Sequence, residues 1–391
     1  MATVIKQVLL ISFCIFVSVS LLACGGGSDS TNLQMPAPQP SPTPSPPTVP
    51  QTLDDQLAEL TAALADDLIL PAYRNFQTGV SDFNTATNAY CSNLAPTEES
   101  ISQYQIQWLM LSKAWQGIQW LKIGPAMSEN RLFRVQFWPD RNDAVSRGVE
   151  NALIEQIPID ATFIANQNVG AQGIPALEYL LFNEENPLNR AFNRDKRCEL
   201  IQAITVNLMN ISNELVDGWE NTSQRDFTNG EGEFSSINDA LEEFVTNWLE
   251  FIELVKDEKL IVPLTANAPG RPDAAEHFRS DKSLEIIALN VNTLLAIYGN
   301  DESTSFRHIV KSFLAQGTID DEIMRSLNGA KDAVERILAI QNSYTAALND
   351  PELRQELNLL IGHLRDYRDH FTTGFIQSLD LNIGFNSNDG D

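Results

Sequence analysis

Apolar side chains recur at intervals of three and four residues along most of the chain after residue 52. This spacing places them on one face of an α-helix. The repeats predict helices within the ranges 53–68, 101–123, 189–219, 237–254, 284–298, 319–348 and 353–379. Alternating β-branched residues, which favour strands, are nearly absent. The pattern therefore predicts an all-α fold, in which Pro71 is expected to break or kink the first helix.

Two segments interrupt the helical pattern. Residues 226–235 are polar and contain glycine, and residues 262–273 contain three prolines and Gly270. Either segment can join two helical units, because glycine and proline favour turns over helix interiors. We expect one folded region, 52–391, made of two packed helical-bundle halves at about 52–230 and 231–391.

The first residues have the pattern of a targeting segment. A basic start with Lys6 precedes the apolar run 8–22, which is too short for a lasting membrane span. The run ends in Leu21-Leu22-Ala23-Cys24, which resembles a lipoprotein signal-peptidase site. We predict a signal peptide at 1–23 and a lipid anchor on Cys24, where each buried methylene of an acyl chain adds about 0.8 kcal/mol of membrane affinity. The alternative is an ordinary secretory signal beside an unrelated cysteine.

Residues 24–51 are rich in proline, serine and glycine, so we expect an extended tether that holds the folded region away from the lipid surface. No Asp follows Cys24 directly, which favours the outer membrane, facing the periplasm. The net charge of −26 argues against nucleic-acid partners. It is compatible with collecting cations and equally with simple solubility.

Only Cys91 and Cys198 remain outside the predicted signal and anchor. In an oxidising envelope two such cysteines most often pair. A disulfide between them would close a loop of over a hundred residues, which is worth about 4 kcal/mol in the entropic model.

Catalytic signatures are missing from the sequence: it has no His-Glu-x-x-His, no Gly-x-Ser-x-Gly, no phosphate-binding loop and only four histidines. The most distinctive segment is 170–182. There Gln172 and Gly173 end a loop, Pro175 suits the first turn of a helix, and Glu178 follows. Local sequence alone also allows Glu178 to be an ordinary charge near a helix start.

This segment resembles the Gly-x-His-x-x-Glu signature of the imelysin-like family. Other pieces that resemble the family are 137–140 (Phe-Trp-Pro-Asp), 278–280 (Phe-Arg-Ser) with 283–284 behind it, and the terminal 384–391. The resemblance covers about residues 53–391. It implies two bundle-like helical halves with a site between them, in a family described as peptidases or as iron-regulated envelope proteins.

Carried over by position, Gly173 and Glu178 match the signature, whereas Pro175 stands where the histidine belongs. A His and a Glu three residues apart share a helix face and can hold one metal ion, but proline offers no lone pair. The resemblance therefore implies Glu178 as a metal-binding residue only if other groups converge on it. Arg279 and Ser280 are expected to reach it in the cleft, or else to form an ion pair that joins the halves.

We therefore expect a non-catalytic binding lipoprotein that holds iron or another divalent metal, a metal complex or a protein partner in the envelope. One alternative is a metallopeptidase of the imelysin type, against which the loss of the histidine at Pro175 counts. Another is a scaffold that docks an envelope redox partner. His363, Asp366 and His370 share one side of a predicted helix, but interleaved charges favour a solvated face there.

Overall fold

The computed structural model describes residues 51–183, 187–188, 194–302 and 304–383. Contacts group Gln51–Asp391 into one compact unit, separate from Met1–Pro50. The predicted signal peptide, Cys24, nearly all of the tether and the segment 384–391 lie outside the described residues.

Helices make up the regular structure throughout these ranges, which contain no strand, so the predicted all-α fold class is confirmed. The helices of the first group are α1 (Leu53–Ala63), α2 (Leu70–Ser92), α3 (Glu98–Gln116), α4 (Arg131–Val135), α5 (Ala144–Ile154), α6 (Ala161–Ala165), α7 (Gly173–Phe182), α8 (Arg194–Gly218) and α9 (Gln224–Asn229). Those of the second group are α10 (Ile237–Glu253), α11 (Val262–Leu264), α12 (Ser283–Tyr298), α13 (Phe306–His308), α14 (Gly317–Ile340), α15 (Tyr344–Asn349), α16 (Pro351–His370) and α17 (Ile376–Ser378). Within the part of the chain that is described, none of these helices combines the length and the apolar character needed to cross a bilayer.

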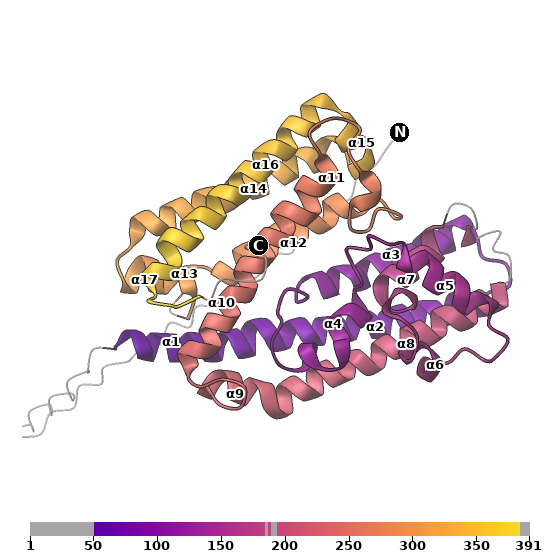
Figure 1. The fold of residues 1–391 in the computed structure, drawn as a ribbon, viewed down its shortest axis with the longest axis horizontal. Coiled ribbons are helices and arrows are strands. Elements are labelled where there is room, and N and C mark those ends of the chain that lie inside the picture. Colours follow the sequence, from indigo (N-terminus) through magenta and orange to yellow (C-terminus); the bar gives the residue numbers. More distant parts are fainter. Residues whose placement is uncertain (1–50, 184–186, 189–193, 303, 384–391) are drawn as a thin grey trace, which may run out of the picture. The chain divides into compact units, whose positions relative to one another are not determined.

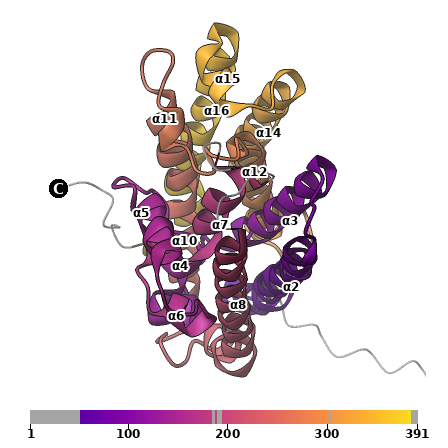
Figure 2. The same ribbon diagram turned by 90° about the vertical axis from the view of Figure 1, so that its right-hand side faces the viewer.

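Two sets of long helices pack side by side within this unit (Figures 1 and 2). In the first set α2 lies between α3 and α8, and in the second α14 lies against α12 and α16. The tryptophans of the predicted apolar faces, among them Trp108, Trp115 and Trp248, are fully buried. Burial of one large apolar side chain contributes about 1.5–3 kcal/mol, so these stripes account for how the helices associate.

The chain does not end its first helix at Pro71. A π-helical turn, Leu64–Ile69, joins α1 to α2, and Pro71 lies in the first turn of α2 directly after it. A π turn widens the helix by one residue, which gives room for a ring that lacks an N–H donor. The expected break is therefore a local widening of a continuous helix.

The two irregular segments are partly helical. Residues 226–229 belong to α9, which ends at Gly230 in a left-handed conformation. Residues 262–264 form α11, and the prolines that follow lie in a loop with a short 3₁₀ turn, Pro272–Ala274. That loop leads to the functional site described below.

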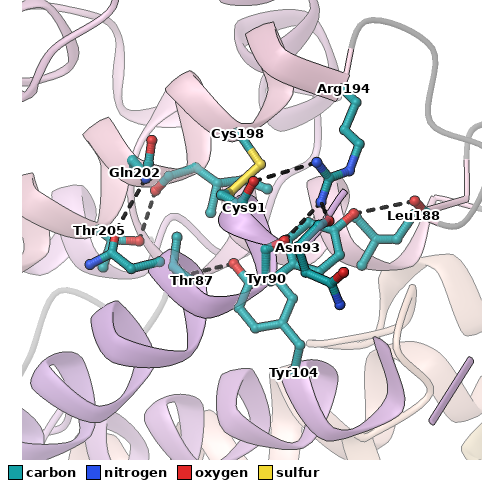
Figure 3. The surroundings of a disulfide bond; sticks show 12 residues. Thr87, Tyr90, Cys91, Asn93, Tyr104, Leu188, Arg194, Cys198, Gln202 and Thr205 are labelled. Atoms are coloured by element: carbon teal, nitrogen blue, oxygen red, sulfur yellow. Dashed lines mark hydrogen bonds between the residues drawn. A yellow bond between two sulfur atoms is a disulfide. The ribbon is translucent and has the colours of Figure 1, made fainter. Parts of the chain in front are cut away.

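A disulfide joins the end of α2 to the start of α8 (Figure 3). Cys91 and Cys198 have Cα atoms 5.7 Å apart and are separated by 107 positions in the sequence, so the predicted pairing is confirmed. Arg194 lies beside the bridge and donates to the carbonyl oxygens of Tyr90 and Asn93, each at 2.7 Å. The disulfide and the arginine together hold the end of α2 against the start of α8, and α8 is one of the helices that pack on α7.

Candidate functional site

Helix α7 is buried among α3, α4, α5 and α8. Its first residue, Gly173, has φ +72°, and a Cβ built there would lie 2.2 Å from the carbonyl oxygen of Val135. Only glycine allows this approach, because that φ is unfavourable for other residues and the neighbouring atom is backbone. The indole N–H of Trp108 donates to the carbonyl oxygen of Ile174 at 3.2 Å. The start of α7 is thus fixed against α3 and α4.

Glu178 lies beyond the first turn of α7, with only 2% of its surface exposed. Its Oε1 accepts hydrogen bonds from the backbone N–H of Ser280 at 2.9 Å and from the Ser280 hydroxyl at 2.7 Å. This burial and these hydrogen bonds do not fit the alternative interpretation of Glu178 as an ordinary solvent-exposed charge near the start of a helix. The structure brings Glu178 together with Ser280, as the sequence analysis expects.

His277 faces the other oxygen of Glu178. Its Nδ1 lies 3.8 Å from Glu178 Oε2, too far for a hydrogen bond, and the imidazole is 3% exposed. On the far side of the ring, Nε2 lies 2.9 Å from the hydroxyl of Ser112. Trp108 packs edge-on against the imidazole with ring centroids 5.2 Å apart. The ring is therefore held from two sides with Nδ1 directed towards the carboxylate.

Unlike Ser280, Arg279 interacts with side chains other than Glu178. Its guanidinium donates to the Ser146 hydroxyl at 3.1 Å and lies 3.7 Å from a carboxylate oxygen of Asp143. It also lies over the ring of Phe278, 4.4 Å from the centroid. Arg279 lines the same cavity as Glu178, however, so both side chains are available to one ligand.

That cavity has a volume of about 680 Å³, within the usual range for small-molecule sites. Its wall combines aromatic and arginine side chains with the Glu178–His277 pair. The aromatic and arginine residues are Phe137, Trp138, Phe278, Arg141, Arg271 and Arg279. Five carboxylates line the cavity as well, those of Asp140, Asp143, Glu178, Glu258 and Asp273, and two of them pair with Arg141 and Arg279. The site thus offers carboxylates, an imidazole, three guanidinium groups and apolar surface around one cavity.

A buried polar network extends from the imidazole. The ammonium of Lys259 donates to Gln116 Oε1 at 2.8 Å and to Asn290 Oδ1 at 2.7 Å, and it lies 2.8 Å from Glu276 Oε2. Gln136 donates to the other oxygen of Glu276 at 2.9 Å. These residues come from helices of both groups, so the network connects α3 with α12 and with the loop that carries His277.

Charge balance in this network keeps Glu276 ionised. Burial on its own raises the pKa of a carboxyl, but the ammonium of Lys259 outweighs burial, and the pKa of Glu276 is lowered. A carboxylate is therefore maintained directly before His277 in the sequence.

Sequence analysis anticipates Gly173, Glu178 and Ser280 but not His277, Lys259 or Glu276 as site residues. His277 lies in a turn with φ +57°, where no helical period places it. Lys259 appears as one charge in a charged run, although it is 2% exposed. The sequence does indicate that Ser112 and Gln116 take part in a buried polar contact, because they are polar residues on the apolar face of α3.

Comparison with known proteins identifies the family. The family model described as Imelysin matches residues 69–370, most of the chain. The chain belongs to the imelysin family. This imelysin-family chain has no match among curated proteins.

Two solved structures share the imelysin fold with this chain. An imelysin-like protein from Psychrobacter arcticum 273-4 aligns with a TM-score of 0.71 at 20% identity, over 86% of this chain and 99% of that one. A protein from Parabacteroides distasonis ATCC 8503, described as an iron-regulated protein A precursor, aligns with a TM-score of 0.66 at 16% identity. That alignment covers 85% of this chain and 96% of the other. At these identities the likeness concerns the fold.

The imelysin signature departs from its usual form here, and the structure shows what stands beside Glu178 instead. Pro175 is buried in α7, and the nearby imidazole comes from His277, about a hundred residues further along. Among the described residues, no three His, Cys, Asp or Glu side chains gather closely enough to hold a metal ion by themselves. A metal at this site therefore fits only if it brings further ligands with it.

Proposed function

We propose that this imelysin-family chain is a lipid-anchored binding protein of the cell envelope that holds a metal complex against Glu178 and His277. The observation that supports it is the buried pair itself: Glu178 Oε2 and His277 Nδ1 lie 3.8 Å apart on the wall of a partly open cavity. In the tautomer whose Nε2–H donates to Ser112, Nδ1 carries a lone pair. A carboxylate oxygen and an imidazole nitrogen then face the same point, which suits a cation.

The remaining ligands in this proposal belong to an anionic chelator. A metal ion bound by carboxylate and imidazole generally takes four to six ligands, and the protein supplies two. Arg141, Arg271 and Arg279 line the same cavity, and guanidinium groups bind carboxylates well. Arg141 and Arg279 already pair with Glu258 and Asp143 of the same wall, so in this proposal the chelator shares or exchanges those partners. Iron is the metal we propose, because one similar structure is described as an iron-regulated protein A precursor.

Binding of ferric citrate tests this proposal. We expect the full chain, purified in detergent, to retain one iron per chain after equilibrium dialysis against micromolar ferric citrate. Glu178→Gln keeps the shape of the side chain and an acceptor for Ser280 but removes the negative charge. We expect it to lower the affinity at least about 10–100-fold, the range seen even when residues behind metal ligands are changed.

Asp320→Asn is the matched control. Asp320 is likewise an almost fully buried carboxylate, but it accepts a hydrogen bond from Arg307 and does not line the Glu178 cavity. It should leave iron binding unchanged. The proposal fails if no iron is retained, if citrate alone binds equally well, or if both variants lose iron alike. Chelator-sensitive cleavage of a protein substrate would instead favour the peptidase alternative.

The anchor is a separate part of the proposal and depends on Cys24. The apolar run and the Leu-Leu-Ala-Cys ending support it, as does the tether that follows. We expect the wild-type chain to fractionate with outer membranes and to require detergent for release. Cys24→Ala should move it to the detergent-free soluble fraction, and a variant that stays with the membranes would contradict lipid anchoring at this position.

A further inference from the structure

A second cavity, of about 730 Å³, lies beside the Glu178 cavity. Residues from α3, α4, α10 and α16 line it, and Gln136, Trp138 and Glu258 line both cavities. Glu178 and His277 are not part of its wall. The second cavity is therefore a distinct space, and the proposed metal complex gives no account of it.

Aromatic side chains form much of its wall: Trp115, Trp120, Phe133, Trp138 and Phe251. Trp120 and Phe251 stack with their ring planes 20° apart and their centroids separated by 6.0 Å. Phe133 is 50% exposed, so one aromatic ring stands at the opening while others lie deep. Flat aromatic surfaces bind flat apolar molecules, and their faces attract cations.

The charges around the cavity favour a positive ligand. Six acidic side chains line it against four basic ones. Ion pairs within the wall neutralise acids and bases alike, as where Lys122 lies 2.5 Å from Glu250 and Arg368 lies 3.0 Å from Glu253, and they leave the acidic excess of two unchanged. The chain as a whole carries a net charge of −26, which adds to the attraction of cations.

A buried acceptor completes the site. Gln136 is 93% buried, and its amide N–H₂ donates to Glu276, but its Oε1 has no hydrogen-bond partner among the described residues. A buried carbonyl oxygen without a partner is destabilising, because it has lost its hydrogen bonds to water, so such atoms usually meet a ligand or an ordered water. Glu276, on the same wall, is already paired with Lys259 at 2.8 Å, so the oxygen of Gln136 is the atom that favours a donor.

We propose that the second cavity binds a small organic cation with an aromatic ring, such as an arylalkylammonium. The ring lies against the aromatic wall, and the ammonium faces Gln136 and Glu276 and donates to the free carbonyl oxygen. This proposal does not depend on metal binding at Glu178, because neither Glu178 nor His277 lines the second cavity, although Gln136, Trp138 and Glu258 line both.

Calorimetric titration of the full chain with 1-naphthylmethylammonium tests this. The matched probe is 1-naphthylacetate, which has the same ring system and the opposite charge. We expect saturable binding of the cation and at least tenfold weaker binding of the anion. Equal binding of the two probes would overturn the assigned ligand class, and no saturation with millimolar cation would overturn the site.

Two matched variants locate the bound cation. Phe133→Ala removes a half-exposed ring from the second cavity only, and we expect about tenfold weaker binding, because the ring of the ligand loses an aromatic contact at the opening. Phe278→Ala removes a comparably exposed ring, at 36%, from the Glu178 cavity only, and should leave the affinity unchanged. Both rings are partly exposed, so neither variant threatens folding. Loss of binding with Phe278→Ala instead of Phe133→Ala would place the cation in the wrong cavity and overturn the proposal.

Discussion

Lys259→Met is expected to lower the free energy of unfolding by about 3–5 kcal/mol, the usual cost of removing one partner from a buried ion pair. The ammonium of Lys259 is 2% exposed and lies 2.8 Å from Glu276, which is 3% exposed. Without the lysine, Glu276 keeps its burial but loses its nearest positive charge. Asn290 also loses the donor to its carbonyl oxygen, whereas Gln116 Oε1 loses one donor but still accepts from Gln119 and Asn290. Urea unfolding followed by circular dichroism measures the change.

A double-variant cycle separates the ion pair from its surroundings. Glu276→Leu alone should also be strongly destabilising, because it leaves a buried ammonium. The combination of Lys259→Met and Glu276→Leu should cost less than the sum of the two single changes, by about 0.5–3 kcal/mol, since no buried charge remains. Strict additivity would show that the two groups do not interact.

Lys311→Met is the control for loss of a lysine ion pair at the surface. Lys311 lies 2.7 Å from Asp301, and both side chains are 39% exposed. Exposed pairs contribute about 0–1 kcal/mol, so this variant should remain close to the wild type. A cost for Lys259→Met as small as that for Lys311→Met would mean that solvent reaches the buried network.

The helical fold follows from the sequence because apolar periodicity decides which faces are buried. The same periodicity also predicts that Lys259 is buried, which the charged run around it conceals. Along α10 and into the π-helical segment after it, the buried positions Leu241, Val245, Trp248, Ile252 and Val255 recur at three and four, and the next step is residue 259. The π-helical turn Leu254–Ile261 continues the helix without interruption, so the lysine falls on the buried face. A charged residue in phase with an apolar stripe is thus a signal of a buried network.

No comparable pattern in the sequence predicts that Glu178 and His277 lie together. The two residues are about a hundred positions apart, and His277 lies in an irregular turn that no repeat describes. The resemblance at 278–280 pointed to the right loop and gave Ser280 its correct partner. The same segment suggested Arg279 for the carboxylate, but neighbouring residues in a turn point in different directions, and Arg279 contacts Ser146 and Asp143. Side-chain direction in loops depends on tertiary packing, which short sequence pieces do not encode.

Replacing both Cys91 and Cys198 by alanine is expected to lower the free energy of unfolding by about 2–5 kcal/mol. The bridge spans 107 positions, and the entropic model assigns about 4.7 kcal/mol to a loop of this length. The stabilisation arises because the crosslink restricts the unfolded chain, whereas the contacts of Arg194 with Tyr90 and Asn93 remain available in the variant. Urea unfolding under oxidising conditions gives the difference between the wild type and the double variant.

The dependence of unfolding on urea identifies the origin of this effect. An unfolded chain without the crosslink expands and exposes more surface, so the slope of the free energy against urea concentration should increase in the double variant. A reducing agent should convert the wild type to the behaviour of the variant and leave the variant itself unchanged. A lower stability with an unchanged slope would place the effect in the folded state, in the packing between α2 and α8. An unchanged stability would show that the two helices are held without the disulfide.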